Sequence, residues 1–355
     1  MKKLKVLTLV LALILMFTAC AKPANNDIQE AQEQEKNKVD NKTSQEKETN
    51  KIKVVASFYP VYDFTKKIGR EKIEVINLTQ TGSAHGFEPS IEDMKKIVDA
   101  DLLVINGGGF ESWIENVKTN NPNLDIVDMS HDVDLIESNA IHGDEHDHDD
   151  HTEEAHDHDD HAEEAHDHDK DDDHAGHSHG KYDPHTWLSL DNAKEMLETI
   201  KEKLSEKNPE NKGYYQANYD TIKEKIEAID DKYEDLFEAH KGKSFVVPHK
   251  AFGYLAKDYD LEQIGVEGIN SDTEPTLTRV GEIVDLMKEH KINTVFYEYG
   301  KSDKIAQTIA AELGGNVKPI STLEVIGQGD VDKGNDYLSL MEMNLQNILD
   351  SFEGK

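Results

Sequence analysis

Apolar residues from position 51 onward follow two alternating periods. Some segments alternate between apolar and polar residues or are continuously apolar, as strands are, and the segments between them have the spacing of helices. One of these helical segments follows Ser90 and has Asp93 at the position where a capping box needs an acid. Strands that alternate with helices predict a parallel, doubly wound α/β lobe. Four short runs rich in Val and Ile have the length and composition of buried strands: residues 51–58, 72–79, 101–106 and 124–130.

A long amphipathic segment follows at residues 214–242. No helix breaker occurs inside it before Gly242, and roughly 27 residues of helix would extend about 40 Å. The segment therefore predicts a helix that runs along the whole protein rather than within one domain. Its apolar positions recur close to every 3.6 residues: Tyr219, Ile222, Ile226, Ile229, Tyr233 and Leu236.

The alternation of strands and helices restarts beyond this helix and predicts a second α/β lobe. We expect an N-terminal lobe at residues 51–210, a linking helix at 211–242 and a C-terminal lobe at 243–355. The elements expected in the second lobe are a strand, turn and helix at 244–258, strands at 261–268, 292–299 and 317–320, and helices at 275–291, 302–315 and 335–352.

The first fifty residues have the composition of an export segment and a tether. Residues 1–19 combine three early lysines with a short apolar core, which predicts a secretory signal peptide; an uncleaved anchor is the less favoured alternative. Cys20 follows small residues and resembles the acylated cysteine of a bacterial lipoprotein. Residues 20–50 are polar and predict a flexible, lipid-anchored tether. Cys20 is the only cysteine, so any metal site must use His, Asp and Glu.

A run of histidines and acids occupies residues 142–179. It holds twelve of the 18 histidines and 17 acidic residues against one lysine. Because no apolar residue larger than Ala occurs in it, we expect a solvated, disordered loop with weak metal affinity. Its histidines are His142, His146, His148, His151, His156, His158, His161, His166, His168, His174, His177 and His179.

The formal net charge of −34 disfavours nucleic acid as a partner, because phosphate binding needs clustered Lys and Arg. The acidic run carries about half of this charge and should attract cations. It therefore suits capture of metal for a tighter site elsewhere. The alternative is a solvated spacer whose metal affinity is incidental.

Three histidines outside this run lie in loops whose backbone is fixed by Pro or Gly. They are His85 in HGFEP, His185 in DPHTWLS and His249 in PHKAFGY. Loops next to strand ends are where α/β sheets place ligands. His131, in a polar stretch after a strand, is a weaker candidate. The wide spacing of these histidines is by itself little evidence, because a site built from separate loops leaves no compact motif.

These three motifs, in this order and with an acidic histidine-rich stretch before the second, resemble the zinc-binding receptors of bacterial ABC importers (ZnuA/AdcA-like). The likeness extends from about residue 51 to the C-terminus. It implies two α/β lobes bridged by one long helix, with the metal between the lobes. It also implies a monomeric, non-enzymatic, lipid-anchored extracytoplasmic protein that captures Zn²⁺ and passes it to an ABC permease.

The resemblance also implies the ligands. His85, His185 and His249 match the nitrogen ligands, and Glu324 in STLEVIG matches a position where family members offer a carboxylate. A water molecule in the fourth position is the alternative to Glu324.

Three further acids are expected outside the ligand shell. Glu298 matches an acid at a strand end that should orient a ligand, and Asp183 lies two residues before His185. Glu88 is expected in the outer shell or at the start of a helix.

Three imidazoles with one carboxylate or water suit Zn²⁺. A manganese-binding homologue is possible in principle, although manganese binders are expected to use two carboxylates; Cu²⁺ and Ni²⁺ remain open. The function could also be that of a zinc buffer, chaperone or adhesin without a transporter, or that of a zinc enzyme. The sequence contains no HExxH, which disfavours a zinc hydrolase of that type.

Overall fold

The computed structural model describes residues 51–138, 181–267 and 276–355. The predicted signal peptide, Cys20, the tether and the histidine-rich run at 142–179 lie outside the described residues.

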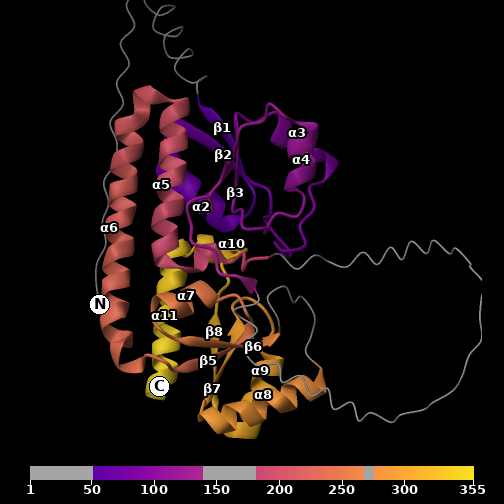
Figure 1. Cartoon of the computed structure of the whole chain (residues 1–355), viewed down its shortest axis with the longest axis vertical. Coiled ribbons are helices and arrows are strands. Elements are labelled where there is room, and N and C mark those ends of the chain that lie inside the picture. The colour runs from indigo at the N-terminus through magenta and orange to yellow at the C-terminus, as the bar shows by residue number, and fades with distance from the viewer. Residues whose placement is uncertain (1–50, 139–180, 268–275) are drawn as a thin grey trace, which may run out of the picture. The chain divides into compact units, whose positions relative to one another are not determined.

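The N-terminal lobe is built on a four-stranded parallel sheet with the strand order β2-β1-β3-β4 (Figure 1). Ser90 is the N-cap of helix α3 and forms the predicted capping box, in which the side chains of Ser90 and Asp93 each accept from the other residue's backbone N–H. The elements are β1 (Ile52–Ala56), α2 (Tyr59–Gly69), β2 (Ile73–Asn77), α3 (Ile91–Val98), β3 (Leu102–Ile105), α4 (Ile114–Asn120) and β4 (Ile126–Asp128).

The C-terminal lobe repeats the arrangement with the strand order β6-β5-β7-β8, again all parallel. The predicted fold class, two doubly wound α/β lobes joined by one long helix, is confirmed. The elements of this lobe are β5 (Ser244–His249), α7 (Gly253–Asp258), β6 (Glu262–Glu267), α8 (Leu277–His290), β7 (Thr294–Glu298), α9 (Lys304–Leu313), β8 (Asn316–Ile320), α10 (Gln328–Val331) and α11 (Tyr337–Glu353).

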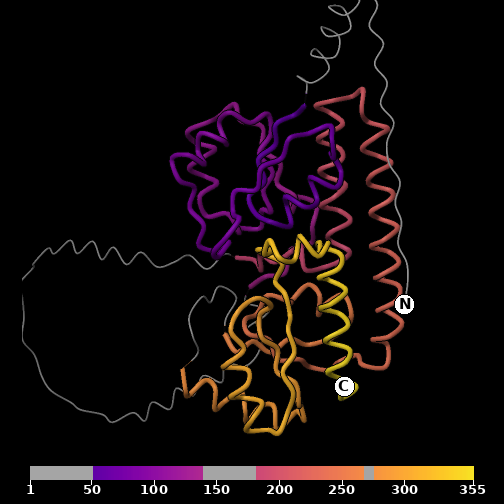
Figure 2. Tube along the Cα trace, turned by 180° about the vertical axis from the view of Figure 1, so that it is seen from behind, coloured from indigo at the N-terminus to yellow at the C-terminus, as the bar shows by residue number. Residues whose placement is uncertain are grey.

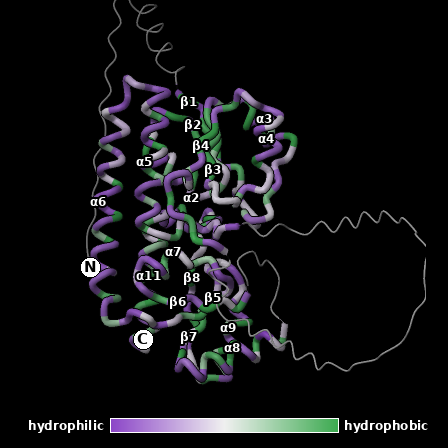
Figure 3. Tube along the Cα trace, viewed as in Figure 1, coloured by the Kyte–Doolittle hydropathy of each residue, from purple (hydrophilic) through white to green (hydrophobic). Residues whose placement is uncertain are grey.

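The long helix is α6 (Lys212–Phe237), which packs against α5 (Leu190–Lys207). Its 26 residues span about 39 Å. In Figure 3 it is mostly hydrophilic, with scattered apolar positions, whereas the strands are mostly apolar. Near its start Asn218 donates to the carbonyl oxygen of Ile68 in α2 at 2.8 Å. Near its end the Tyr233 hydroxyl bonds Gln346 of α11 at 3.0 Å, where α11 runs beside it in Figure 2.

The two lobes share one apolar core. A single cluster of buried side chains extends from Ile52 of β1 through Trp187 and Phe245 to Leu349 of α11. Hydrogen bonds cross the same region: Trp187 Nε1 donates to the Thr322 carbonyl at 2.7 Å, and the Tyr337 hydroxyl donates to the Trp187 carbonyl at 2.6 Å. The segment that carries Trp187 is therefore packed into both lobes.

Two local predictions were wrong. The stretch FESWIENVKTN (residues 110–120) predicts a short helix, but the helix begins only at Ile114, because Gly107 to Gly109 all have positive φ and the chain must turn before a helix can start. The long helix begins at Lys212 and ends at Phe237, followed by a 3₁₀ turn, instead of continuing to Gly242. The short helix α10 has too few apolar residues to show a period in the sequence.

Replacing Trp187 with Phe should lower the free energy of unfolding of the metal-free protein. The change leaves the buried Thr322 carbonyl without its donor, which costs about 1–3 kcal/mol beyond the change in packing. Urea unfolding followed by circular dichroism measures the loss. Trp113→Phe is the matched control, because Trp113 packs in a separate apolar cluster of the N-terminal lobe. Equal losses in the two variants would show that the hydrogen bond contributes nothing.

Candidate metal centre

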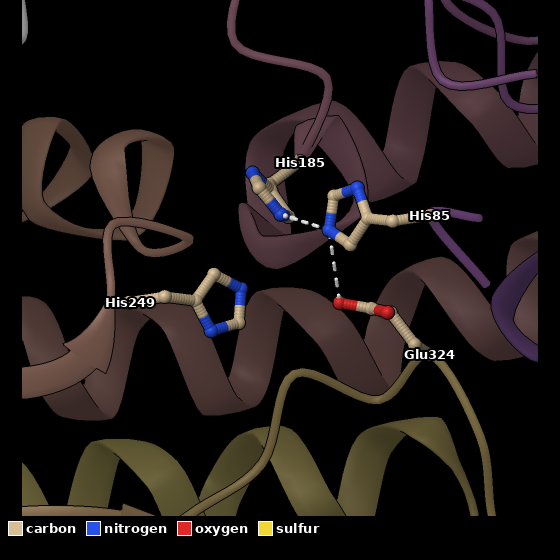
Figure 4. A group of neighbouring side chains, drawn as sticks. All are labelled: His85, His185, His249 and Glu324. Atoms are coloured by element: carbon tan, nitrogen blue, oxygen red, sulfur yellow. Dashed lines mark hydrogen bonds and ion pairs between the residues drawn. The ribbon is translucent and has the colours of Figure 1, made fainter. Parts of the chain in front are cut away.

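Four side chains from separate segments converge on one point, as Figure 4 shows. His85 lies in the loop after β2, and His185 directly precedes a 3₁₀ turn. His249 is the last residue of β5, and Glu324 follows β8. Each offers one ligand atom, and these atoms all lie within 4.8 Å of one another. The structure thus brings together the four residues that the sequence nominated as ligands.

The distances within this cluster suit one small cation. Nε2 of His85 lies 3.0 Å from Nε2 of His185 and 3.4 Å from Oε1 of Glu324. Metal–nitrogen bonds of roughly 2.0–2.1 Å in a tetrahedral site place two ligand atoms about 3.3 Å apart. The measured separations therefore leave room for a zinc-sized ion at the centre, with nitrogen and oxygen donors around it.

Burial of unpartnered polar atoms also indicates a cation. His185, His249 and Glu324 are exposed by only 0%, 7% and 8%. Within the described part of the chain, Nε2 of His249 and Oε1 of Glu324 have no hydrogen-bond partner although both are buried. Leaving such atoms unpaired costs free energy. A metal ion bound to both would remove that cost, so the residues fit the ion.

Asp183 fixes the orientation of His185. Its Oδ1 accepts hydrogen bonds from Nδ1 of His185 at 2.7 Å and from the backbone N–H of His185 at 3.0 Å. Because a carboxylate can only accept, Nδ1 carries the proton and Nε2 presents its lone pair to the cluster. Asp183 is fully buried.

Asn106 is a site residue that the sequence analysis missed. Its Nδ2 donates to the Pro184 carbonyl, and its Oδ1 accepts from the Thr186 hydroxyl, each at 2.9 Å. It therefore clamps the residues on both sides of His185. Its position as the last residue of a predicted strand was the signal that could have identified it.

Glu111 accepts a hydrogen bond from the backbone of Asn106 and was also not predicted from the sequence. Its Oε1 accepts from the backbone N–H of Asn106 at 2.8 Å and from the Ser57 hydroxyl at 2.7 Å. Burial raises the pKa of Glu111 to about 7, although these hydrogen bonds partly oppose the shift.

Electrostatics in the cluster favours the metal-binding protonation states. Burial, together with the neighbouring His185, lowers the pKa of His249 to about 3, so its imidazole is neutral at pH 7. Burial alone would raise the pKa of Glu324. The imidazole of His85, whose Nε2 lies 3.4 Å from Oε1, outweighs burial together with His185 and His249 and lowers that pKa to about 2. Glu324 is therefore a carboxylate at neutral pH.

The remaining predicted residues lie around the cluster or apart from it. Glu298 ends β7, where its Oε1 accepts from the Thr322 hydroxyl at 3.4 Å and its Oε2 pairs with Lys301 at 2.9 Å. Glu88 is exposed and bonds Ser112 at 3.4 Å, so the structure does not bring it into the cluster. His131 is exposed after β4. No helix in the described ranges is both long and apolar enough to cross a membrane.

Acid should destabilise the metal-free protein partly through His249. Its pKa is about 3 in the folded state against an ordinary value of 6.5, so below pH 6.5 only the unfolded chain takes up this proton. The stabilisation that neutral His249 gives the folded state is therefore complete above pH 6.5. This part of the free energy of unfolding falls as the pH drops from 6.5 to 3, by at most about 1.4 kcal/mol per pH unit.

The His249→Gln variant should therefore show a shallower fall in the free energy of unfolding between pH 7 and pH 4. Urea titrations at successive pH values measure the slope. The same substitution at the exposed His290 is the control and should keep the wild-type slope. A wild-type slope in His249→Gln would contradict the burial of a neutral imidazole.

Comparisons with known proteins identify relatives of this chain. The family model described as zinc-uptake complex component A, periplasmic (ZnuA), matches residues 54–351. The zinc-binding lipoprotein AdcA of Streptococcus pneumoniae serotype 4 is 32% identical over 305 residues, which cover 86% of this chain and 56% of AdcA. The high-affinity zinc uptake system protein ZnuA of Bacillus subtilis is 32% identical over 313 residues, covering 87% of this chain and 90% of that protein. The chain thus spans about half the length of the AdcA proteins it matches.

A solved structure shows the same fold. The Zn(II)-bound ZnuA-like domain of Streptococcus pneumoniae AdcA superposes with a TM-score of 0.67 at 28% identity, covering 85% of this chain and 98% of that domain. The resemblance predicted from the three histidine motifs is confirmed: this chain belongs to the ZnuA family of zinc-uptake components.

Proposed function

We propose that this protein is an extracytoplasmic receptor that binds one Zn²⁺ ion and delivers it to an ABC permease. The ligands would be His85, His185, His249 and Glu324. The observation that carries the proposal is the convergence of these four side chains, with two buried ligand atoms that have no hydrogen-bond partner within the described residues. The printed names of the relatives, a zinc-binding lipoprotein and a high-affinity zinc uptake protein, support it.

The donor set favours zinc over manganese. Three imidazole nitrogens and one carboxylate oxygen suit a borderline ion, whereas Mn²⁺ prefers a larger share of oxygen ligands. The set also favours binding over catalysis. Glu324 would fill the fourth position, and a catalytic zinc site keeps that position open for water or substrate. A manganese carrier and a hydrolase are therefore less favoured.

Attachment and capture are proposed from the sequence. Acylation of Cys20 would tether the receptor to the membrane through residues 20–50, and the name of the AdcA relative as a lipoprotein supports this. The twelve histidines of residues 142–179, among 17 acidic residues, would gather zinc near the tight site. We also propose that the protein works as a monomer. Glu298 and Asp183 would lie outside the ligand shell.

Replacing His185 with Ala should abolish tight binding of zinc. Loss of a ligand should weaken affinity by at least about 100-fold, the upper end of what loss of an outer-shell partner costs. Competition with a zinc chelator measures the affinity. His131→Ala, at an exposed histidine, is the matched control and should bind like the wild type. Deletion of residues 142–179 should also leave one tight site. Loss of that site on deletion would contradict the proposed ligands.

Growth in zinc-depleted medium separates a transport receptor from a zinc buffer. A strain that lacks this protein should grow poorly without added zinc, and the wild-type gene should restore growth. The His249→Ala variant should not restore it, because the site loses a ligand. Removal of the cognate permease should cancel the benefit of the wild-type gene. A benefit that persists without the permease would favour a buffer.

A further inference from the structure

Tyr254 connects the two motifs that carry His185 and His249. It lies in α7, five residues after His249, and its side chain is 2% exposed. Its hydroxyl donates to the Asp183 carbonyl oxygen at 2.8 Å and accepts from the backbone N–H of Ile136 at 3.1 Å. One buried hydroxyl of the C-terminal lobe therefore holds two separate backbone segments of the N-terminal lobe.

These two segments are themselves paired, and we call residues 136–138 and 181–183 the stem. The Asp183 N–H donates to the Ile136 carbonyl at 2.8 Å, and the Ser138 N–H donates to the Lys181 carbonyl at 3.0 Å. Glu137 and Tyr182 form an antiparallel bridge between them. Ile136 and Asp183, which are hydrogen-bonded to each other, are therefore both also hydrogen-bonded to the Tyr254 hydroxyl.

The stem also leads directly to a proposed ligand. The carboxylate of Asp183 holds Nδ1 of His185 at 2.7 Å, and the backbone of the same residue accepts from Tyr254. A fixed Asp183 backbone keeps its carboxylate, and hence Nε2 of His185, aimed at the cluster. Both His185 and Asp183 are fully buried, so a shift of one must move the other.

We propose that Tyr254 is a positioning residue for the zinc site: it fixes the stem and thereby His185 before the metal arrives, and so slows release of the ion. This inference rests on the proposed function. Without the hydroxyl, two buried backbone groups would each lose a partner and the segment before His185 would be less ordered in the metal-free protein. Zinc binding would then have to order this segment, and the free-energy cost of that ordering would weaken the affinity for zinc.

The test compares Tyr254→Phe with Tyr215→Phe in the full chain. Tyr215 is the matched control: it is 0% exposed, and its hydroxyl has no hydrogen-bond partner within the described part of the chain. Stopped-flow transfer of zinc to a chelator gives the dissociation rate. We expect a rate about ten-fold faster than wild type in Tyr254→Phe and a wild-type rate in Tyr215→Phe.

A second readout separates positioning from a general loss of stability. The visible absorption bands of the Co²⁺-loaded protein report the geometry of the ligands. They should change in Tyr254→Phe and stay the same in Tyr215→Phe. Wild-type dissociation and an unchanged Co²⁺ spectrum in Tyr254→Phe would overturn the inference, whatever happens to its unfolding temperature.

The outcomes distinguish this inference from the proposed function. A wild-type protein that binds no stoichiometric zinc would overturn both. Tight zinc binding with identical behaviour of wild type and Tyr254→Phe would overturn the role of Tyr254 alone. Hydrogen exchange on the wild type gives an independent check that needs no variant. The Ile136 amide, which donates to Tyr254, should already exchange slowly in the metal-free protein, and rapid exchange there would contradict the inference.

Discussion

The hydrogen bond between Asp183 and His185 is the contact on which the proposed metal centre depends. It is 2.7 Å long, both side chains are fully buried, and it leaves Nε2 of His185 as a lone-pair donor. A buried imidazole turned the other way would lose both its partner and its ligand role. Hydrogen bonds from both lobes hold the segment from Asp183 to Trp187. Asn106 clamps it from the N-terminal lobe, and Tyr254 and Tyr337 bond its backbone from the C-terminal lobe.

This arrangement makes the site a product of the whole fold. The ligand atoms come from four segments, and one apolar cluster runs beneath them from β1 to α11. A continuous core couples the lobes, because opening it would expose apolar surface to water. Three of the four proposed ligands are buried, whereas His85 is partly exposed.

The fold class could be predicted from the sequence because strands and helices each impose a local period of apolar residues. Three histidines were nominated from Pro- and Gly-flanked motifs, and the family resemblance added Glu324. Asn106 and Tyr254 escaped prediction for a physical reason. Their partners lie far along the chain, as with Tyr254 and Asp183, which are 71 residues apart, and no spacing records such a contact. The start of α4 was misplaced because three successive glycines with positive φ delay the helix.

A crystal structure of the zinc-loaded protein, with the metal identified by its anomalous signal, would show directly which side chains bind the ion. We expect one zinc ion bound to Nε2 of His85, Nε2 of His185, Nε2 of His249 and a carboxylate oxygen of Glu324. The hydrogen bond between Asp183 and His185 should be retained. Tight zinc held instead by histidines of residues 142–179 would contradict it. So would a zinc ion between the lobes that does not bind His185.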